Sequence, residues 1–204
     1  MQNSKMVAVL TGDVINSRKG DTASWMPILK RTLAYFGKDP KDWEIYRGDS
    51  FQMTLPVINA LDAAFLIKAS LKQIPKLDVR IAIGIGTIDY QAAKITESSG
   101  DAFTRSGACF DALKKQTMGI ATGDEDFNEK FNLMLTLGLL TMDSWSSIVA
   151  KAIQTALENP DKNQLEVAQI LRKSQSSVSE ALTRGGYEEL LRLINYFKHQ
   201  IHKL

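Results

Sequence analysis

The chain has 204 residues, of which 44% are hydrophobic and 24% charged, values that exclude a disordered or collagen-like protein. The formal charge is +2, from 25 basic and 23 acidic residues, and this balance does not by itself indicate nucleic acid or a membrane surface as partner. The single cysteine excludes an internal disulfide, and no apolar stretch approaches the roughly 20 residues that cross a bilayer. We therefore expect a cytoplasmic globular protein without a membrane partner.

The hydrophobic residues alternate or recur at helical spacing in nine successive segments of the first two thirds of the chain. The segments predicted as strands are 6–10, 43–47, 50–55, 78–88 and 118–122. The segments predicted as helices are 21–36, 59–74, 101–115 and one that begins after the N-cap residue Asp124.

The first six of these elements follow the order β-α-β-β-α-β, which predicts an α+β fold of the ferredoxin-like type. Its sheet is expected to be antiparallel, with helices on one face. Thr11-Gly12-Asp13 is expected to form a turn that closes the first strand, and Gly48-Asp49 a two-residue hairpin loop. Gly84 and Gly86 leave one face of strand 78–88 open to close approach by a helix or a ligand.

Only helical patterns follow residue 140, at 145–157, 164–171, 176–184 and 187–202. We therefore expect two domains, one over residues 1–140 and an all-α domain over 141–204. No Gly/Ser-rich or Pro-rich linker marks the boundary, which indicates a rigid connection between the two.

The segment 164–184 has the pattern of a helix-turn-helix, the motif that places its second helix in the major groove of DNA. Ala168 is the small residue expected where the two helices cross, and Val167, Leu171, Val178 and Leu182 are apolar at the expected core positions. The polar residues around the turn and along the second helix are the candidates for contact with double-stranded DNA. They are Arg172, Lys173, Gln175, Ser176, Ser177, Ser179, Thr183 and Arg184.

The alternative is a plain helical hairpin that serves packing or dimerisation. Residues 141–204 contain eight basic and seven acidic residues, well short of the charge typical of a strong nucleic-acid binder. Glu180 on the expected contact face would also repel phosphate.

Two acidic residues, Asp13 and Asp49, form a candidate metal site. The first strand is central in a ferredoxin-like sheet and neighbours the second hairpin strand, so the two carboxylates are expected to converge. Mg²⁺ and similar hard cations commonly bind through one or two carboxylates together with substrate phosphates. Alternatively, Asp13 caps the following turn and Asp49 serves only the hairpin.

Polar and basic residues beside this pair are candidates for contact with a nucleotide. Asn16, Ser17 and Arg18 follow Asp13, and Arg47 precedes the hairpin loop. Backbone N–H groups and cations of such a loop can surround phosphates, although a solvated loop has the same composition.

Four motifs in this order resemble the class III nucleotidyl cyclase domain: Leu10-Thr-Gly-Asp13, Tyr46-Arg-Gly-Asp-Ser-Phe51, Val79-Arg-Ile-Ala-Ile-Gly-Ile-Gly86 and Ser99-Gly-Asp-Ala-Phe103. The resemblance implies that Asp13 and Asp49 hold two metal ions, Mg²⁺ or Mn²⁺, at a nucleoside triphosphate. It also implies an Asn and an Arg in the helix after Gly100, but Thr104 and Ala108 stand at those positions, and Ile45 replaces the purine-selecting Lys. Since donors to a transferred phosphoryl group contribute several kcal/mol to catalysis, a working cyclase is not expected.

The cyclase-like motifs followed by a Trp-bearing helix and a Ser-rich second helix resemble the SatD family of bacterial proteins over nearly the whole chain. That resemblance implies a regulator that binds DNA. We expect the cyclase-like domain to sense a nucleotide or another partner. We also expect a homodimer, because one short recognition helix gives limited affinity. Two alternatives stay open: a metal-dependent enzyme of nucleotide binding or nucleotidyl transfer that uses Asp13 and Asp49, and a protein-interaction module without DNA binding.

Overall fold

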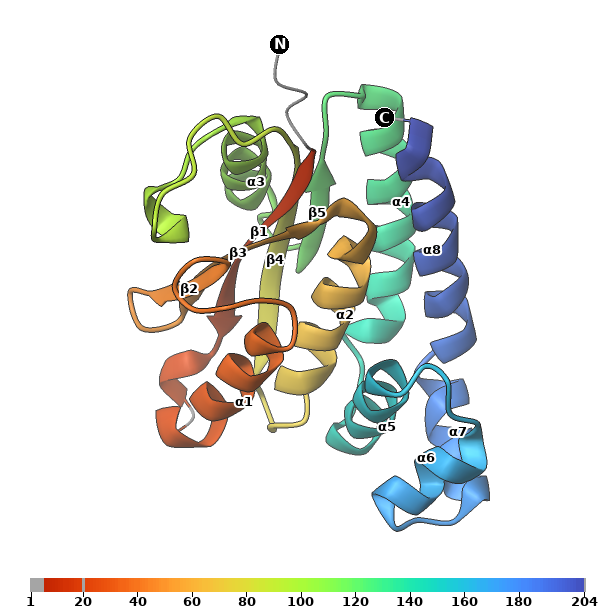
Figure 1. The fold of residues 1–204 in the computed structure, drawn as a ribbon. Helices are drawn as coiled ribbons and strands as arrows, with labels where there is room; N and C mark the ends of the chain where they lie inside the picture. The colour runs from red at the N-terminus through yellow and green to blue at the C-terminus, as the bar shows by residue number, and fades with distance from the viewer. Residues whose placement is uncertain (1–5, 20, 204) are drawn as a thin grey trace.

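The computed structural model describes residues 6–19 and 21–203 as one five-stranded sheet with eight α-helices (Figure 1). The strands are β1 (Val7–Ile15), β2 (Trp43–Tyr46), β3 (Ser50–Pro56), β4 (Asp78–Gly86) and β5 (Met118–Ala121). The helices are α1 (Thr22–Ala34), α2 (Ala60–Leu71), α3 (Asp101–Ala112), α4 (Glu125–Met142), α5 (Ser147–Glu158), α6 (Gln164–Leu171), α7 (Gln175–Arg184) and α8 (Tyr187–Gln200). These elements confirm the mixed α+β class and the order of strands and helices predicted from the sequence.

The strand order across the sheet is β2-β3-β1-β4-β5, with β1 in the centre. β1 pairs antiparallel with both β3 and β4, and β3 pairs antiparallel with β2. The predicted antiparallel sheet is wrong at one edge, because β5 runs parallel to β4. α3 connects these two strands, and a helical crossover of this kind brings the second strand back parallel to the first.

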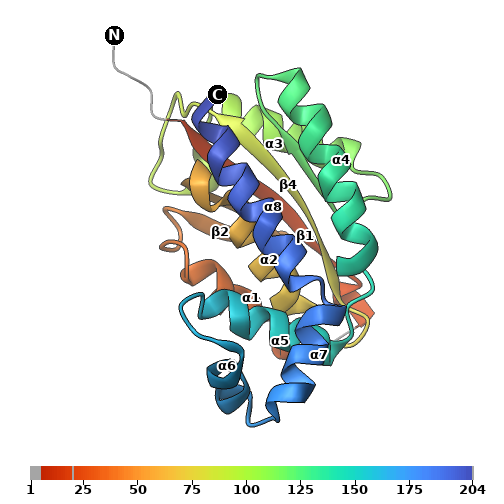
Figure 2. The ribbon, with the colours of Figure 1, turned by 90° about the vertical axis from the view of Figure 1, so that its right-hand side faces the viewer.

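The two faces of β4 differ in the size of their side chains. Ile81 and Ile83 are fully buried and belong to the same core as Leu29 of α1 and Phe65 of α2. On the other face, a Cβ added to Gly84 would lie 2.2 Å from the carbonyl oxygen of Ala102 in α3. Helices therefore cover both faces of the sheet, not one as predicted, because the small residues of β4 admit α3 against the second face (Figure 2).

β1 is longer than predicted, since Thr11, Gly12 and Asp13 continue the strand instead of closing it with a turn. Gly12 has no room for a side chain, because a Cβ there would lie 2.4 Å from the ring of Phe51. The strand continues because Asp13 pairs with Ser50 on β3 and with Arg80 on β4.

The hairpin between β2 and β3 has a three-residue connection, one residue longer than predicted. Tyr46 pairs with Ser50, which leaves Arg47, Gly48 and Asp49 in the turn. Arg47 and Gly48 both adopt left-handed backbone conformations, with φ of 53° and 87°.

The C-terminal helices return to the sheet. α8 runs beside α4, where the ring centroids of Phe131 and Phe197 lie 5.5 Å apart (Figure 1). Lys198 of α8 also pairs with Asp62 of α2 at 2.9 Å. The hydrophobic core runs continuously from the sheet into these helices, so the division into residues 1–140 and 141–204 stays a prediction.

None of the helices in the described part of the chain is long and apolar enough to span a lipid bilayer.

Candidate functional site

A cleft of about 540 Å³ lies at the end of β1, where the loop to α1, the β2–β3 turn and the segment before β5 meet. The structure brings together five of the residues predicted to form the metal and nucleotide sites, and adds four that were not in those predictions. The predicted ones are Asp13, Asn16, Ser17, Arg18 and Asp49, and the others that carry polar or charged side chains are Arg80, Lys114, Lys115 and Thr117.

Asp13 is engaged by a cation from the neighbouring strand. Nε of Arg80 donates to Oδ1 of Asp13 at 3.0 Å, and Nη2 of Arg80 donates to Oδ2 at 2.5 Å. The guanidinium also lies over the ring of Phe110, with Cζ 5.0 Å from the ring centroid. The hydrogen bonds to Asp13 raise the pKa of Arg80. A bidentate pair of this kind is among the stronger polar contacts in proteins.

Asp49 links the hairpin turn to the loop that follows β1. Its carbonyl oxygen accepts a hydrogen bond from the backbone N–H of Val14 at 3.0 Å. Its Oδ2 accepts a hydrogen bond from the hydroxyl of Ser17 at 2.5 Å. Asp49 therefore holds the hairpin turn against the end of β1 and also lines the cleft.

The two carboxylates line the same cleft, where Arg80 occupies the side of Asp13 through which a divalent cation would bind. Both oxygens of Asp13 already accept hydrogen bonds from Arg80. Within residues 6–19 and 21–203, no group of three or more His, Cys, Asp or Glu side chains is arranged to hold a metal ion.

The predicted nucleotide contacts fall into two groups. Asn16, Ser17 and Arg18 line the cleft, although the side-chain amide of Asn16 donates to the carbonyl oxygen of Lys76 at 2.9 Å. Arg47 does not line the cleft and is exposed in the hairpin turn. Its left-handed backbone, which the sequence did not reveal, determines this position.

The positions that depart from the cyclase pattern lie outside the cleft. Thr104 and Ala108 are exposed on α3. Arg105, the cation next to Thr104 on α3, donates to the carbonyl oxygen of Ile85 at 2.6 Å and pairs with Asp101 at 3.0 Å. Sequence reasoning missed Lys114 and Lys115, whose only signal is a pair of lysines in a turn before a strand.

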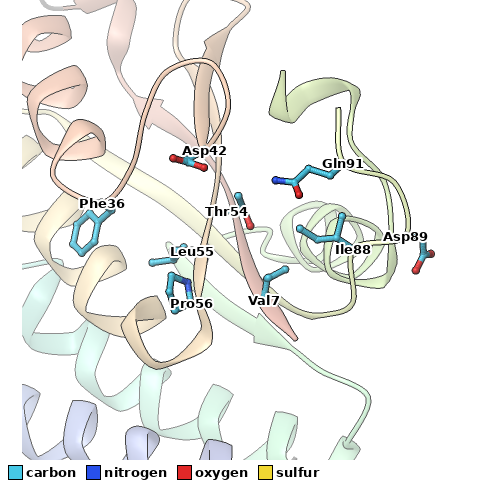
Figure 3. A pocket seen from close by; sticks show the side chains of 9 residues that line it. All are labelled: Val7, Phe36, Asp42, Thr54, Leu55, Pro56, Ile88, Asp89 and Gln91. Atoms are coloured by element: carbon cyan, nitrogen blue, oxygen red, sulfur yellow. The ribbon is translucent and has the colours of Figure 1, made fainter. Parts of the chain in front are cut away.

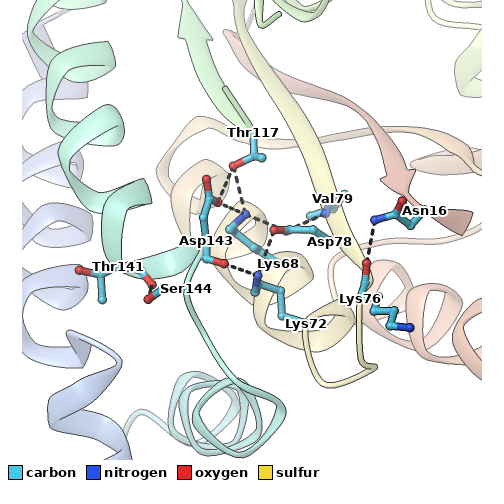
Figure 4. A network of polar contacts seen from close by, with 10 residues as sticks. All are labelled: Asn16, Lys68, Lys72, Lys76, Asp78, Val79, Thr117, Thr141, Asp143 and Ser144. Atoms are coloured by element: carbon cyan, nitrogen blue, oxygen red, sulfur yellow. Dashed lines mark hydrogen bonds and ion pairs between the residues drawn. The ribbon is translucent and has the colours of Figure 1, made fainter. Parts of the chain in front are cut away.

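A buried polar network borders the cleft and continues to the junction of α4 and α5 (Figure 4). The side chain of Lys68 in α2 is fully buried, and its Nζ lies 2.7 Å from carboxylate oxygens of both Asp78 and Asp143. The same Nζ donates to the hydroxyl of Thr117 at 3.1 Å, and that hydroxyl donates to Asp143 at 2.8 Å. Thr117 therefore belongs both to the cleft and to this network.

α6 and α7 form a pair of helices joined by the three residues Arg172, Lys173 and Ser174. Arg172 adopts a left-handed conformation that ends α6, and Ser174 caps α7 by accepting a hydrogen bond from the backbone N–H of Ser177. The predicted core positions Val167, Ala168, Val178 and Leu182 are at most 3% exposed, and Leu171 is half-buried.

The eight residues predicted to contact DNA lie on this helical pair, at the end of the molecule remote from the N-terminal end of β1 (Figure 2). Ser179 is half-buried, and the other seven are exposed: Arg172, Lys173, Gln175, Ser176, Ser177, Thr183 and Arg184. Glu180 is exposed beside them, and one of its carboxylate oxygens lies 3.8 Å from Nε of Arg184.

A second cavity, of about 550 Å³, opens between the end of α1, β3 and the loop after β4 (Figure 3). Its charged residues are Asp42, which accepts a hydrogen bond from the backbone N–H of Lys38, and Asp89, which accepts one from Thr87. None of the residues predicted to form a site lines it.

No protein-family model matches the chain, and no curated protein matches it.

Proposed function

We propose that the protein is a DNA-binding regulator of the SatD type, in which α6 and α7 form a helix-turn-helix. The observation that carries the proposal is the division of α7 into two faces. Val178, Ala181 and Leu182 pack into the core, while the opposite face presents short polar side chains from its first turn onward. In a helix-turn-helix, the first residues of the second helix contact base edges.

The charges around the turn support the same proposal. Arg172 and Lys173 lie in the connection and Arg184 at the far end of α7, all exposed. Three cations against the single carboxylate of Glu180 give this face a positive surplus, although the helices as a group are almost neutral. Contacts between such cations and phosphates position a protein on DNA.

We propose a ferredoxin-like, cyclase-like core for the first four strands. The order β2-β3-β1-β4, with antiparallel neighbours throughout, supports this assignment. The cleft at the end of β1 would then be the sensory site of the regulator. Catalysis of nucleotidyl transfer is not part of the proposal, because Thr104 and Ala108 supply neither cation nor amide and do not line the cleft.

The network around Lys68 gives the sensory site a physical connection to the helices. Thr117 lines the cleft, and Asp143 caps the end of α4, where the chain enters α5. A ligand that moves Thr117 therefore acts on the contacts that hold this junction.

We propose that the protein is a homodimer, and the exposed leucines of α4 support this proposal. Leu133, Leu137 and Leu140 are 61%, 58% and 75% exposed, and their spacing of four and three residues places them on one face of the helix. A contiguous apolar stripe of this kind suits contact with a second copy.

The test measures binding of the protein to a fluorescein-labelled DNA duplex, by fluorescence anisotropy at several salt concentrations. We expect the wild-type protein to bind as a dimer. Arg172→Ala/Lys173→Ala should reduce the slope of log K against log salt by about 4, because two phosphate contacts are lost in each of the two subunits. Lys38→Ala/Lys41→Ala removes the same charge from exposed positions outside α6 and α7 and should leave the slope unchanged. Equal binding by both variants would assign α6 and α7 to packing or protein interaction.

A further inference from the structure

The charges that line the cleft at the end of β1 favour an anion. Among the residues that the structure describes, two carboxylates, Asp13 and Asp49, line the cleft together with four cationic residues. The cations come from three separate segments of the chain: Arg18, Arg80, and the pair Lys114 and Lys115. Because the bidentate pair cancels one carboxylate and one cation, three cations remain against the single carboxylate of Asp49.

Arg80 holds the position in which a metal ion would have to bind Asp13. Its guanidinium contacts both carboxylate oxygens and is held from the side by the ring of Phe110. A divalent cation on Asp13 would have to displace this bidentate contact. At Asp49, Oδ2 already accepts the hydroxyl of Ser17.

We propose that the cleft binds a small molecule with a chain of two or more phosphates without a divalent metal ion, the Arg80 guanidinium serving in place of the metal. The volume of about 540 Å³ lies within the range of small-molecule sites. Arg18, Lys114 and Lys115 neutralise the phosphates, and Arg80 keeps Asp13 from repelling them. This inference deepens the proposed sensory role and does not depend on DNA binding.

The first test is isothermal titration calorimetry with inorganic pyrophosphate and with ATP, each in EDTA and in Mg²⁺. We expect binding in EDTA that Mg²⁺ does not strengthen. Lys114→Ala/Lys115→Ala should weaken binding at least tenfold, whereas Lys38→Ala/Lys41→Ala, with the same loss of charge, should not. Equal affinity for the two ligands would identify the phosphate chain as the recognised group, and tighter binding of ATP would add its nucleoside. Binding that requires Mg²⁺, or none in EDTA, would overturn the proposal.

The second test uses Mn²⁺ alone, followed by electron paramagnetic resonance. Wild-type protein should leave the signal of aqueous Mn²⁺ unchanged at about 100 μM metal, a concentration comparable to the dissociation constant of a weak cation site. Arg80→Gln releases Asp13 and should bind Mn²⁺, and Asp13→Asn/Arg80→Gln should not. Circular dichroism establishes that each variant is folded. Tight binding of Mn²⁺ by the wild type, or none by folded Arg80→Gln, contradicts the substitution of Arg80 for the metal.

These results are separate from those of the DNA-binding test. A protein that binds pyrophosphate in EDTA but no duplex would keep this inference and lose the helix-turn-helix. The reverse result would keep the DNA-binding regulator and remove the metal-free anion site. If Arg80→Gln does not fold, the comparison of EDTA with Mg²⁺ in the wild type still decides.

Discussion

Replacement of Lys68 by Met removes the central charge of the buried network and keeps a long unbranched side chain in α2. The ammonium lies within 3.1 Å of three oxygens, on Asp78, Asp143 and Thr117. Loss of one partner of a buried ion pair costs about 3–5 kcal/mol, because the remaining charge is left without its counterion.

Two features of the network place the effect at the lower end of this range. Asp78 keeps Lys72, whose Nζ lies 3.1 Å from its Oδ2, and the side chain of Asp143 is 43% exposed to water. We therefore expect the free energy of unfolding to fall by about 3 kcal/mol. In a protein of this size, that corresponds to a decrease in Tm of about 6–12 °C.

The assay is thermal unfolding followed by circular dichroism, with urea unfolding to obtain the free energy directly. Lys162→Met is the control, because Lys162 is exposed and its Nζ lies 3.9 Å from Oε1 of Glu166 in a surface ion pair. Pairs of this kind contribute at most about 1 kcal/mol. A Lys68→Met protein as stable as the control would show that the buried ammonium does not hold α2, β4 and the α4–α5 junction together.

Three further predictions follow from individual positions. Gly84→Ala should lower the free energy of unfolding in urea by about 2 kcal/mol or more, because the new Cβ meets the backbone of Ala102. Gly107→Ala is the control, since its Cβ has open space, and it should raise the free energy of unfolding by about 0.5–1 kcal/mol. Equal effects of the two substitutions would contradict the packing of α3 against β4. Burial raises the pKa of Cys109 to about 11, which lowers its thiolate fraction at pH 8, so a disulfide reagent should react at least tenfold more slowly than with free cysteine unless the protein is unfolded. Ser174→Ala removes the cap of α7 and should cost about 1 kcal/mol in the same unfolding assay, and an unchanged stability would show that the cap contributes nothing.

The secondary structure was predictable because apolar periodicity is strong in this chain. The apolar residues alternate along this segment as Val79, Ile81, Ile83 and Ile85. β4 begins at the predicted residue, Asp78, and ends at Gly86, two residues earlier than predicted. The end of β1 was not predictable from the same rule, because Thr11, Gly12 and Asp13 look like a turn and are kept extended by pairing on both sides.

The candidate cleft was predictable in part. Topology alone indicated that Asp13 and Asp49 would lie near each other, and they line one cleft. The partner of Asp13 depends on the register between β1 and β4, which the sequence does not reveal, and that register sets Arg80 opposite it. Lys68 could not be recognised either, since a single lysine in an apolar helix is usually assumed to reach solvent.

The packing of α8 along α4 was also outside the prediction. Helical periodicity identifies which residues of α8 face a core, and Phe197 is fully buried as that pattern requires. The helical periodicity does not identify the element against which α8 packs, because aromatic side chains pack equally well against a neighbouring helix or a sheet.

The most direct test of the proposed regulator is selection of binding sites from a pool of randomised duplex DNA at low salt. The wild-type protein is compared with Arg172→Ala/Lys173→Ala/Ser177→Ala. We expect enrichment of a two-fold symmetric sequence by the wild type and its loss in the variant, since both half-sites would be contacted through the turn and α7. Absence of any enriched sequence with folded wild-type protein would contradict DNA binding by α6 and α7.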